Sequence, residues 1–292
     1  GGEMELVTPG QRIQSEAGFL RGHGTYVKDG GETLVASVAG VVQRVNKLVS
    51  VVPVKSRYIG QVGDVVVGRV LEVGQKRWGL DVNSTQAAVL MLSSVHLPGG
   101  VQRRRTYEDQ LNMRQLYSEG ELMSAEVHQF FGDGAMSLHT RSRKYGKLRG
   151  GELVCVPWVL VRRMKHTHHV LEGLGIEVLL ASNGFIWISP ECPSNPHQDL
   201  EDDDQEHDWT PPAPTPPSPQ VRESMARVKQ SIKALASCFL EISPDSIMDT
   251  YQKSFSLGQP IASMLLGDSP KDATETARER RDRAQGNKMS DD

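Results

Sequence analysis

Clustered arginine and lysine residues are the side chains in this sequence whose type and spacing suggest a chemistry, namely the binding of phosphate groups. Three consecutive arginines, Arg103, Arg104 and Arg105, follow a Pro-Gly-Gly turn, and a loop there would project their side chains into solvent. A guanidinium offers a fork of N–H donors that binds a phosphate through two hydrogen bonds. These arginines are candidates for binding RNA phosphates, and a solvated or subunit-docking cluster is the alternative.

Two further basic segments could extend such a surface. Lys76 and Arg77 precede Trp78 in a predicted turn, where cations and a ring could contact phosphate and base, although such a Trp often packs half-buried. The segment after residue 140 carries several cations around one tyrosine: Arg141, Arg143, Lys144, Tyr145, Lys147 and Arg149. RNA contact and docking onto a partner protein fit this segment equally well.

The pair Asn183-Gly184 lies between two apolar stretches, which is a strong signal for a β-hairpin because both residues tolerate a positive φ. Residues 181–184 also resemble the Gly-x-Asn-Gly element of a divergent KH domain, with Ala181 in place of the first glycine. A KH clamp is a loop between two helices whose backbone approaches the RNA closely. The flanking stretches read as strands, so a structural turn at Ser182, Asn183 and Gly184 is favoured over an RNA clamp.

No pattern in the sequence indicates catalysis or a metal site. His166, His168 and His169 lack a second ligand pair at the spacing of a structural zinc site. The acidic run 201–208 lies in a stretch that looks disordered, whereas catalytic carboxylates need a rigid surrounding shell. No phosphate-binding loop of the Walker type and no nucleophile elbow is present. We therefore expect a protein without cofactor, metal or catalytic activity of its own.

Charge is distributed unevenly along the 292 residues, although the formal net charge is only −3. Residues 143–190 contain 7 Lys and Arg against 3 Asp and Glu, whereas residues 191–220 contain none against 8. The three cysteines form no Cys-x-x-Cys pair, which argues against a disulfide framework or thiolate zinc site and fits a reducing compartment. With no apolar run of membrane-spanning length and no signal pattern, we expect a soluble, intracellular chain.

The first two domains are predicted to be β-rich. Residues 1–54 are rich in glycine and β-branched residues, with a turn expected at Asn46-Lys47, and they predict a small β domain. Residues 55–142 hold three strand-like stretches, a helical stretch near 107–117 and two further strands. That order is typical of a five-stranded OB barrel, which commonly binds single-stranded nucleic acid or a protein partner.

The remainder is predicted to be an α+β domain with a tail. Residues 143–266 begin with the hairpin strands and end in helices expected near 221–241 and 244–253. Between them, residues 193–220 are acidic and proline-rich with few apolar side chains, which predicts a disordered insertion. Residues 267–292 predict a disordered tail or a solvated helix. The fold class is therefore mostly β, with an α+β C-terminal part.

A set of short segments, in the same order along residues 8–190, resembles the ribosomal-RNA-processing protein 4 family. The matching segments are 18–26 (GFLRGHGTY), 35–40 (VASVAG), 44–48 (RVNKL), 57–60 (RYIG), 75–78 (QKRW), 97–100 (LPGG), 103–105 (RRR), 137–142 (SLHTRS), 144–148 (KYGKL) and 183–188 (NGFIWI). Beyond residue 190 only the helix spacing is similar, and the acidic insertion is not part of the pattern.

The resemblance implies a cap subunit of the RNA exosome, with an N-terminal β domain, an S1-type OB domain and a KH domain. Such a cap sits with sister S1/KH caps on a ring of RNase PH-like subunits and guides single-stranded RNA toward an associated 3′–5′ exoribonuclease. It carries no catalysis itself, takes part in ribosomal RNA processing and RNA decay, and works in the nucleus, the nucleolus and the cytoplasm.

Two other functions remain open from the sequence. A polynucleotide-phosphorylase-like exoribonuclease also uses KH and OB modules, but it needs a large catalytic core before them, and here the modules occupy most of the chain. A stand-alone RNA-binding or ribosome-associated factor would bind RNA tightly and in a salt-sensitive manner without a stable protein assembly. A cap subunit should instead bind RNA weakly until it is assembled.

Overall fold

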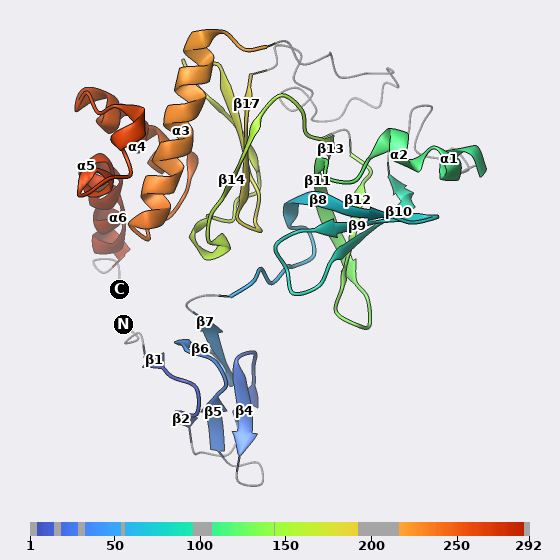
Figure 1. Cartoon of the computed structure of the whole chain (residues 1–292). Helices are drawn as coiled ribbons and strands as arrows, with labels where there is room; N and C mark the ends of the chain where they lie inside the picture. Colours follow the sequence, from blue (N-terminus) through green and yellow to red (C-terminus); the bar gives the residue numbers. More distant parts are fainter. Residues whose placement is uncertain are drawn as a thin grey trace. The chain divides into compact units, whose positions relative to one another are not determined.

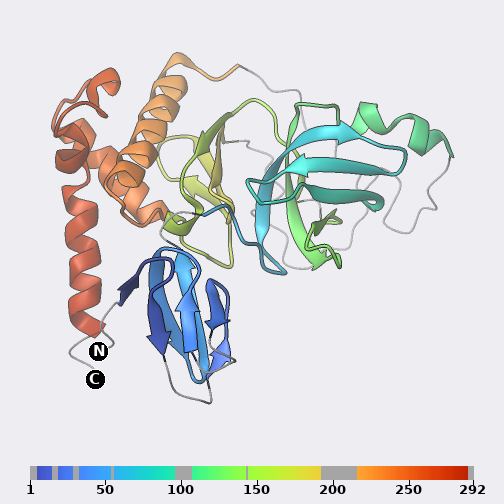
Figure 2. The ribbon, with the colours of Figure 1, turned by 60° about the horizontal axis from the view of Figure 1, so that its bottom comes forward.

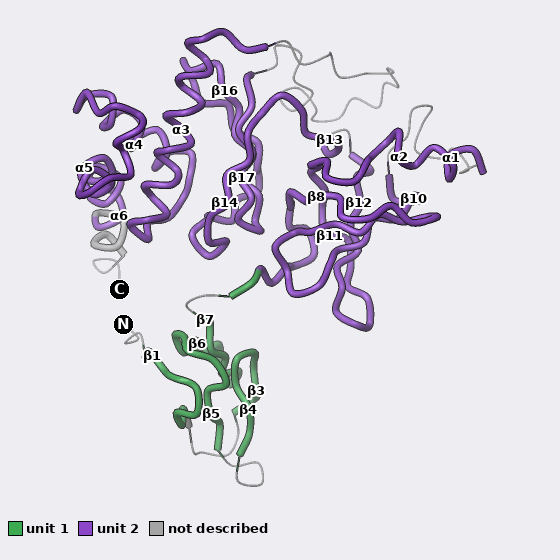
Figure 3. The backbone as a smooth tube through the Cα atoms, in the orientation of Figure 1, with its two compact units in different colours: residues 1–57 green, residues 58–292 purple. Residues whose placement is uncertain are grey.

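The computed structural model describes residues 5–14, 19–28, 33–53, 56–95, 107–142, 144–191 and 216–288. The chain forms two compact units, residues 1–57 and residues 58–292 (Figure 3). The first unit is a small β domain. The second combines a β-barrel, a four-stranded sheet and a group of C-terminal helices (Figure 1).

The N-terminal unit contains two small sheets, with strand orders β1-β6-β7-β3 and β2-β5-β4. Its strands are β1 (Leu6–Val7), β2 (Arg12–Gln14), β3 (Leu20–Arg21), β4 (Thr25–Lys28), β5 (Thr33–Ala36), β6 (Gly40–Val45) and β7 (Leu48–Pro53). The β6–β7 hairpin turns at Asn46, whose φ of 54° is one that asparagine tolerates better than most residues. Val7, Ala36 and Val51 form its buried core.

Five strands of the second unit close into the predicted barrel. They are β8 (Val65–Val73), β9 (Arg77–Asp81), β10 (Ala88–Val95), β11 (Leu122–Phe130) and β12 (Met136–Thr140). Antiparallel pairs join β10 to β9, β9 to β8, β8 to β11 and β11 to β12, and a parallel β12–β10 pair closes the ring. Closure leaves the barrel without a free sheet edge.

Two short helices, α1 (Tyr107–Leu111) and α2 (Met113–Leu116), lie in the connection from β10 to β11, within the predicted helical stretch. Met113 of α2 and the following Tyr117 are buried in the barrel core. The carbonyl oxygen of Tyr117 accepts a hydrogen bond of 3.0 Å from the indole nitrogen of Trp78. Buried Trp78 thereby ties the connection to the start of β9, as expected of a packing residue.

The sheet that follows has the order β14-β17-β16-β15, and all its pairs are antiparallel. After the short β13 (Gly146–Lys147), which pairs with β11, its strands are β14 (Glu152–Cys155), β15 (His168–Leu171), β16 (Ile176–Leu180) and β17 (Phe185–Pro190), with a 3-10 turn η2 (Trp158–Leu160) after β14. Residues 181–184 join β16 to β17, so the structure has a hairpin at Asn183-Gly184.

Helices cover one face of this sheet, as the two views in Figures 1 and 2 show. They are α3 (Pro219–Ser237), α4 (Pro244–Ser256), the 3-10 turn η3 (Ile261–Ser263), α5 (Ser269–Ala273) and α6 (Glu275–Lys288). Val228, Ile232 and Leu235 of α3 pack on Val178 and Ile188 of the sheet. Because strand side chains alternate between faces, the opposite face of the sheet remains for the barrel.

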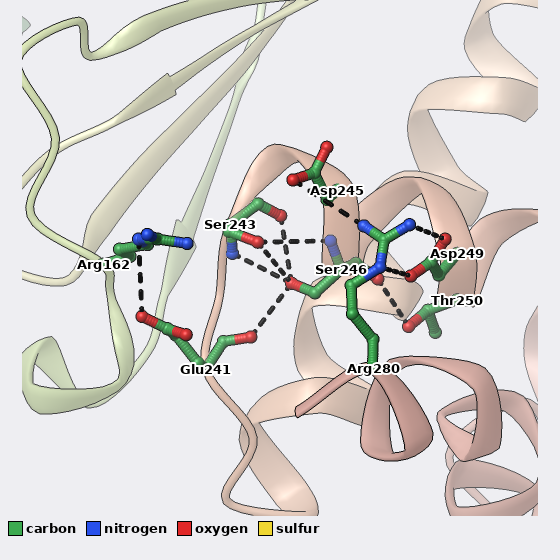
Figure 4. A network of polar contacts seen from close by, with 8 residues as sticks. All are labelled: Arg162, Glu241, Ser243, Asp245, Ser246, Asp249, Thr250 and Arg280. Atoms are coloured by element: carbon green, nitrogen blue, oxygen red, sulfur yellow. Dashed lines mark hydrogen bonds and ion pairs between the residues drawn. The ribbon is translucent and has the colours of Figure 1, made fainter. Parts of the chain in front are cut away.

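The last helices pack more closely than the sequence predicts for residues 267–292. Ala273 and Thr274 are buried, and Ala277 of α6 joins the core under α4. The Arg280 guanidinium contacts Asp249 of α4 at 3.1 Å (Figure 4). The charged sequence of α6 concealed this packing, because only one small apolar side chain is needed where the helix meets the core. Of the predicted insertion, residues 193–220, only residues 216–220 are among the described residues.

Figure 4 also shows how α4 begins. Ser246 donates its backbone N–H to the Ser243 hydroxyl at 3.2 Å, and Ser243 donates its own N–H to the Ser246 hydroxyl at 2.9 Å. This reciprocal capping satisfies two backbone donors at the helix start. On the sheet side, Arg162 faces Glu241 at 3.8 Å. The apolar core shared by α3, α4 and the sheet holds the helical layer in place, and these polar contacts define where α4 begins.

Candidate nucleic-acid interface

The direction of the barrel strands brings several sequence-predicted basic residues to one end of the barrel. There β8 meets β9 at the turn before Arg77, and Arg77 pairs with Met91 in the middle of β10, whose second half continues toward this end. Val95, the last residue of β10, pairs in parallel with Thr140, the last residue of β12. The loops that follow these strands therefore emerge at the same end as the β8–β9 turn.

Lys76 and Arg77 have exposed side chains on a turn with a fixed backbone. The Gly74 N–H donates to the carbonyl oxygen of Arg77 at 2.8 Å, and the Leu92 N–H donates to that of Lys76 at 2.9 Å. Neither side chain makes an ion pair with another described residue. Two unneutralised cations on a fixed turn can bind phosphate, whereas buried Trp78 cannot stack on a base.

The segment after β12 divides into exposed and engaged side chains. Arg141 and Lys144 are exposed, whereas Lys147 pairs with Glu121. Burial raises the pKa of Glu121, but hydrogen bonds from Lys147 and from the Ser118 N–H outweigh it and leave that pKa lowered. The Lys147 charge is thus partly neutralised. Arg141 and Lys144 are the stronger candidates for RNA contact.

Tyr145 is held by the protein instead of being presented as a stacking ring. Its hydroxyl donates to the Glu126 carboxylate at 2.8 Å, and its ring packs against the apolar contact between barrel and sheet. Burial, followed by this hydrogen bond, raises the pKa of Tyr145. The remaining predicted cations, Arg103, Arg104, Arg105 and Arg143, lie outside the described residues.

The turn at Ser182, Asn183 and Gly184 is buried between barrel and sheet. The Asn183 amide nitrogen donates to the carbonyl oxygens of Val67 at 2.7 Å and Val82 at 3.0 Å. The Ser182 N–H donates to the carbonyl oxygen of Val65 at 2.9 Å. Asn183 has no exposed surface. An RNA clamp needs a backbone that RNA can reach, and the backbone of this turn is buried by its contacts with the barrel.

Apolar packing surrounds these hydrogen bonds. Val65 and Val67 on the outer face of β8 pack against Leu179, Ala181 and Trp187 of the sheet. Barrel and sheet thus share a core within the second unit.

A polar cluster ties the same two parts together at a second place. Asp64, just before β8, accepts hydrogen bonds from the Tyr58 hydroxyl at 2.5 Å and from the Gln61 N–H at 2.9 Å. Arg163, from the loop between η2 and β15, contacts the same carboxylate at 3.2 Å. Sequence reasoning missed Asp64 and Arg163, because no local pattern connects residues so far apart in the chain.

The histidines near residue 168 make ordinary structural contacts. His168 Nδ1 lies 3.2 Å from the Glu177 carboxylate, and His169 Nε2 lies 3.0 Å from the carbonyl oxygen of His166. Across the part of the chain that the structure describes, no three His, Cys, Asp or Glu side chains are grouped to hold a metal ion. No helix in that part is long and apolar enough to cross a membrane.

Comparisons with known proteins recover the same order of domains. Residues 6–45 match the family model described as "Exosome complex exonuclease RRP4 N-terminal region", residues 57–129 match "RRP4, S1 domain" and residues 151–194 match "KH domain". The chain is 45% identical over 255 residues to the exosome complex component rrp4 of Schizosaccharomyces pombe, covering 86% of this chain and 76% of that protein. The chain belongs to the RRP4 family of exosome complex components.

Other RRP4 proteins match to a similar extent. The exosome complex component RRP4 of Bos taurus is 47% identical over 259 residues, which covers 86% of this chain and 82% of that protein. That of Mus musculus is 56% identical over 188 residues, covering 64% and 63% of the two chains. The RRP4 resemblance predicted from the sequence is confirmed, and so is the mostly β fold with its five-stranded barrel.

The RRP4 S1 match ends at residue 129, inside β11, and the KH match covers the β14–β17 sheet. β12 lies beyond the S1 match but completes the barrel. S1 domains are OB barrels, and OB and KH domains are RNA-binding types. In this RRP4 chain the KH turn is occupied by the barrel, so the exposed cations at the barrel end are the candidate RNA interface.

Proposed function

We propose that this chain is a non-catalytic, RNA-binding cap of the exosome that guides single-stranded RNA into the channel of an RNase PH-like ring. The observation that carries the proposal is the gathering of exposed cations, Lys76, Arg77, Arg141 and Lys144, at one end of the S1 barrel in a chain of the RRP4 family. Cations without acidic partners attract a phosphate backbone without reading its sequence. Such contacts suit a protein that must pass many RNAs.

Stabilisation of the ring is the second part of the proposal. The curated relatives are exosome complex components, which supports other exosome subunits as partners of this chain. RNase PH-like ring subunits, sister S1/KH caps and an associated 3′–5′ exoribonuclease are the partners we propose. Weak phosphate contacts become effective when several subunits hold one strand, because each further contact is then intramolecular.

Catalysis is assigned to the associated nuclease. The family model that matches the N-terminal residues carries the word exonuclease in its description. We propose that this chain itself contributes binding and positioning only. Purified chain incubated with single-stranded RNA should leave the RNA intact. Cleavage that is lost when one carboxylate of this chain is replaced would refute this part. We also propose a nuclear and nucleolar location, together with the cytoplasm.

The RNA path is tested by crosslinking in the assembled complex. A Lys76→Glu, Arg77→Glu variant should assemble normally but crosslink several-fold less to RNA containing 4-thiouridine, because two phosphate contacts become repulsive. Lys165→Glu, a charge reversal at an exposed residue of the sheet domain, is the matched control and should crosslink as wild type. Equal crosslinking by all three proteins would contradict the proposed barrel-end interface.

A further inference from the structure

A second basic surface lies where the barrel meets the KH sheet, and it joins Arg149 of the segment after residue 140 to two cations, Arg69 and Lys233, that no sequence pattern singles out. Val65, Val67 and Arg69 alternate along the outer face of β8. The two valines are buried against the sheet, and Arg69 is exposed. Arg69 therefore stands at the rim of the shared core, where that face of β8 reaches solvent.

Arg149 reaches the same rim from the segment that follows the barrel. Leu122 on β11 pairs with Arg69, and its carbonyl oxygen accepts a hydrogen bond of 2.9 Å from the Leu148 N–H. β8 and β13 flank β11 on opposite sides at this level, so the backbones of Arg69 and Arg149 are about two strand spacings, or roughly 10 Å, apart. Arg149 is exposed.

Lys233 belongs to α3, the helix that covers the other face of the sheet and contacts its edge strand β14. Cys155, at the end of β14, is an exposed free thiol, and the charges of Arg69 and Lys233 both affect its pKa. Burial raises its pKa, Arg69 lowers it, Asp81 raises it and Lys233 lowers it. The Arg69 guanidinium and the Lys233 ammonium thus both lie within electrostatic range of one thiol, although they come from the barrel and from α3.

The acidic groups around this rim are already engaged or outnumbered. Glu121 pairs with Lys147, and Glu152 pairs with Lys229. Asp81 pairs across the strands with Arg69 and is the remaining carboxylate within electrostatic range of Cys155. Within the described residues, Arg69, Arg149 and Lys233 make no ion pair, so the rim keeps an excess of positive charge.

We propose that this rim, formed by Arg69, Arg149 and Lys233 around Cys155, binds the sugar-phosphate backbone of single-stranded RNA on its way to or from the barrel end. The inference rests on the proposed function, because Arg149 continues the segment that carries Arg141 and Lys144 at the barrel end. The three side chains offer charge and hydrogen-bond donors without a base-reading pocket, so the contacts should be independent of sequence and weaken with salt.

Cys155 provides a native reporter for the test. In the reconstituted exosome complex, alkylation of Cys155 by a maleimide is followed by peptide mass spectrometry with and without a single-stranded oligouridine. Bound RNA should slow alkylation of Cys155 several-fold and leave that of Cys238, at the end of α3, unchanged. Raising the salt should remove the protection.

Charge-reversal variants separate direct contact from indirect effects. Arg69→Glu and Lys233→Glu should each abolish the protection while the variants still assemble, and the milder Arg69→Gln should reduce it. Arg222→Glu is the matched control, because it reverses an exposed charge on the same helix eleven residues away, or about 16 Å along the axis. It should leave the protection intact.

Crosslinking of RNA to the turn at Lys76 and Arg77 is measured in the same samples. It distinguishes a failure of the rim proposal from a failure of the proposed function. If RNA crosslinks there but Cys155 stays unprotected, the rim proposal is overturned and the proposed function stands. If RNA neither crosslinks at the turn nor protects Cys155, both are overturned. Protection of Cys155 by polyglutamate but not by RNA would make the rim a docking site for acidic protein and would likewise overturn the proposal.

Discussion

The side-chain amide of Asn183, in a sheet hairpin, donates a 2.7 Å hydrogen bond to the carbonyl oxygen of Val67 in the barrel, 116 residues earlier. A second bond of 3.0 Å reaches Val82, and the Asn183 carbonyl oxygen accepts 3.1 Å from the Asn83 amide. One buried residue thus satisfies backbone groups within β8 and directly after β9. The element that resembles an RNA clamp joins two RNA-binding domains into one body.

Replacing Asn183 by alanine should therefore destabilise the second unit. The carbonyl oxygens of Val67 and Val82 would lose buried partners, at a cost of about 3 kcal/mol in the free energy of unfolding. Denaturant unfolding followed by tryptophan fluorescence measures this, since Trp78 and Trp187 are both buried in the second unit. Asn46→Gly, at an exposed turn of the N-terminal unit, should change stability by less than about 0.5 kcal/mol. Similar effects of the two substitutions would contradict this role.

Gly184 should tolerate no side chain. Its φ is +82°, and an added Cβ would lie 2.3 Å from the carbonyl oxygen of Val156, so Gly184→Ala combines backbone strain with a clash. Gly173 has a similar φ of +78° but open space around its Cβ position. Gly173→Ala should cost about 1 kcal/mol and Gly184→Ala clearly more, measured as the shift in urea midpoint at constant slope. Equal losses of stability in the two variants would show that backbone strain alone, and no clash with Val156, accounts for the cost at Gly184.

Arg163 should hold barrel and sheet together through Asp64. Arg163→Met removes the only cation that contacts Asp64 among the described residues, while the Tyr58 and Gln61 donors remain. The Arg163 side chain is 37% exposed, so solvent screening limits the expected loss to about 1 kcal/mol. Hydrogen exchange should show faster local opening at residues 61–64.

The neighbouring Arg162 supplies the control for that experiment. Arg162 is 57% exposed and lies 3.8 Å from a Glu241 that is 56% exposed, so this pair should contribute little. Arg162→Met should leave exchange at residues 61–64 unchanged. Protection that falls equally in both variants would remove the special role of Arg163.

The barrel should lose stability as the pH falls below about 6.5, because His139 resists protonation. Burial lowers its pKa; Glu126 raises it, and His128 and Arg141 lower it further. Since the folded pKa is depressed below the unfolded value of 6.5, the unfolded chain binds the proton first, and the stability present above pH 6.5 declines toward the folded pKa.

His139→Gln should flatten this part of the pH dependence, measured as the unfolding midpoint between pH 7.5 and 5. The exposed His23 of the N-terminal unit supplies the control substitution, His23→Gln, which should retain the slope. A wild-type slope in the His139 variant would assign the pH dependence to other groups.

The sequence allowed prediction where structure depends on local pattern. Alternating apolar residues and Gly-containing turns were enough for the five barrel strands, and Asn183-Gly184 was enough for the hairpin. The partners of Asn183 could not be predicted, because Val67 and Val82 offer backbone groups that carry no side-chain signature. The same reason hid the Asp64 and Arg163 contact. For α6, charge dominated the pattern and masked the packing of Ala277.

Among the predicted basic residues, some side chains are exposed and others are engaged by acidic partners. Exposure of Lys76, Arg77, Arg141 and Lys144 places them where phosphate contact needs them, and RNA binding by these residues stays a prediction. Lys147 and Tyr145 looked equivalent in the sequence but are engaged by Glu121 and Glu126. Because an acidic partner can come from any strand, a count of charges along the chain does not separate free cations from paired ones.

The most direct test of the account compares RNA affinity, as a function of salt, for the isolated chain, the exosome complex lacking it and the complete complex. The account predicts that the isolated chain binds weakly, and that adding it to the incomplete complex strengthens binding well beyond either part and steepens the salt dependence. Tight binding by the isolated chain, with no gain on assembly, would contradict the cap function and favour a stand-alone RNA-binding protein.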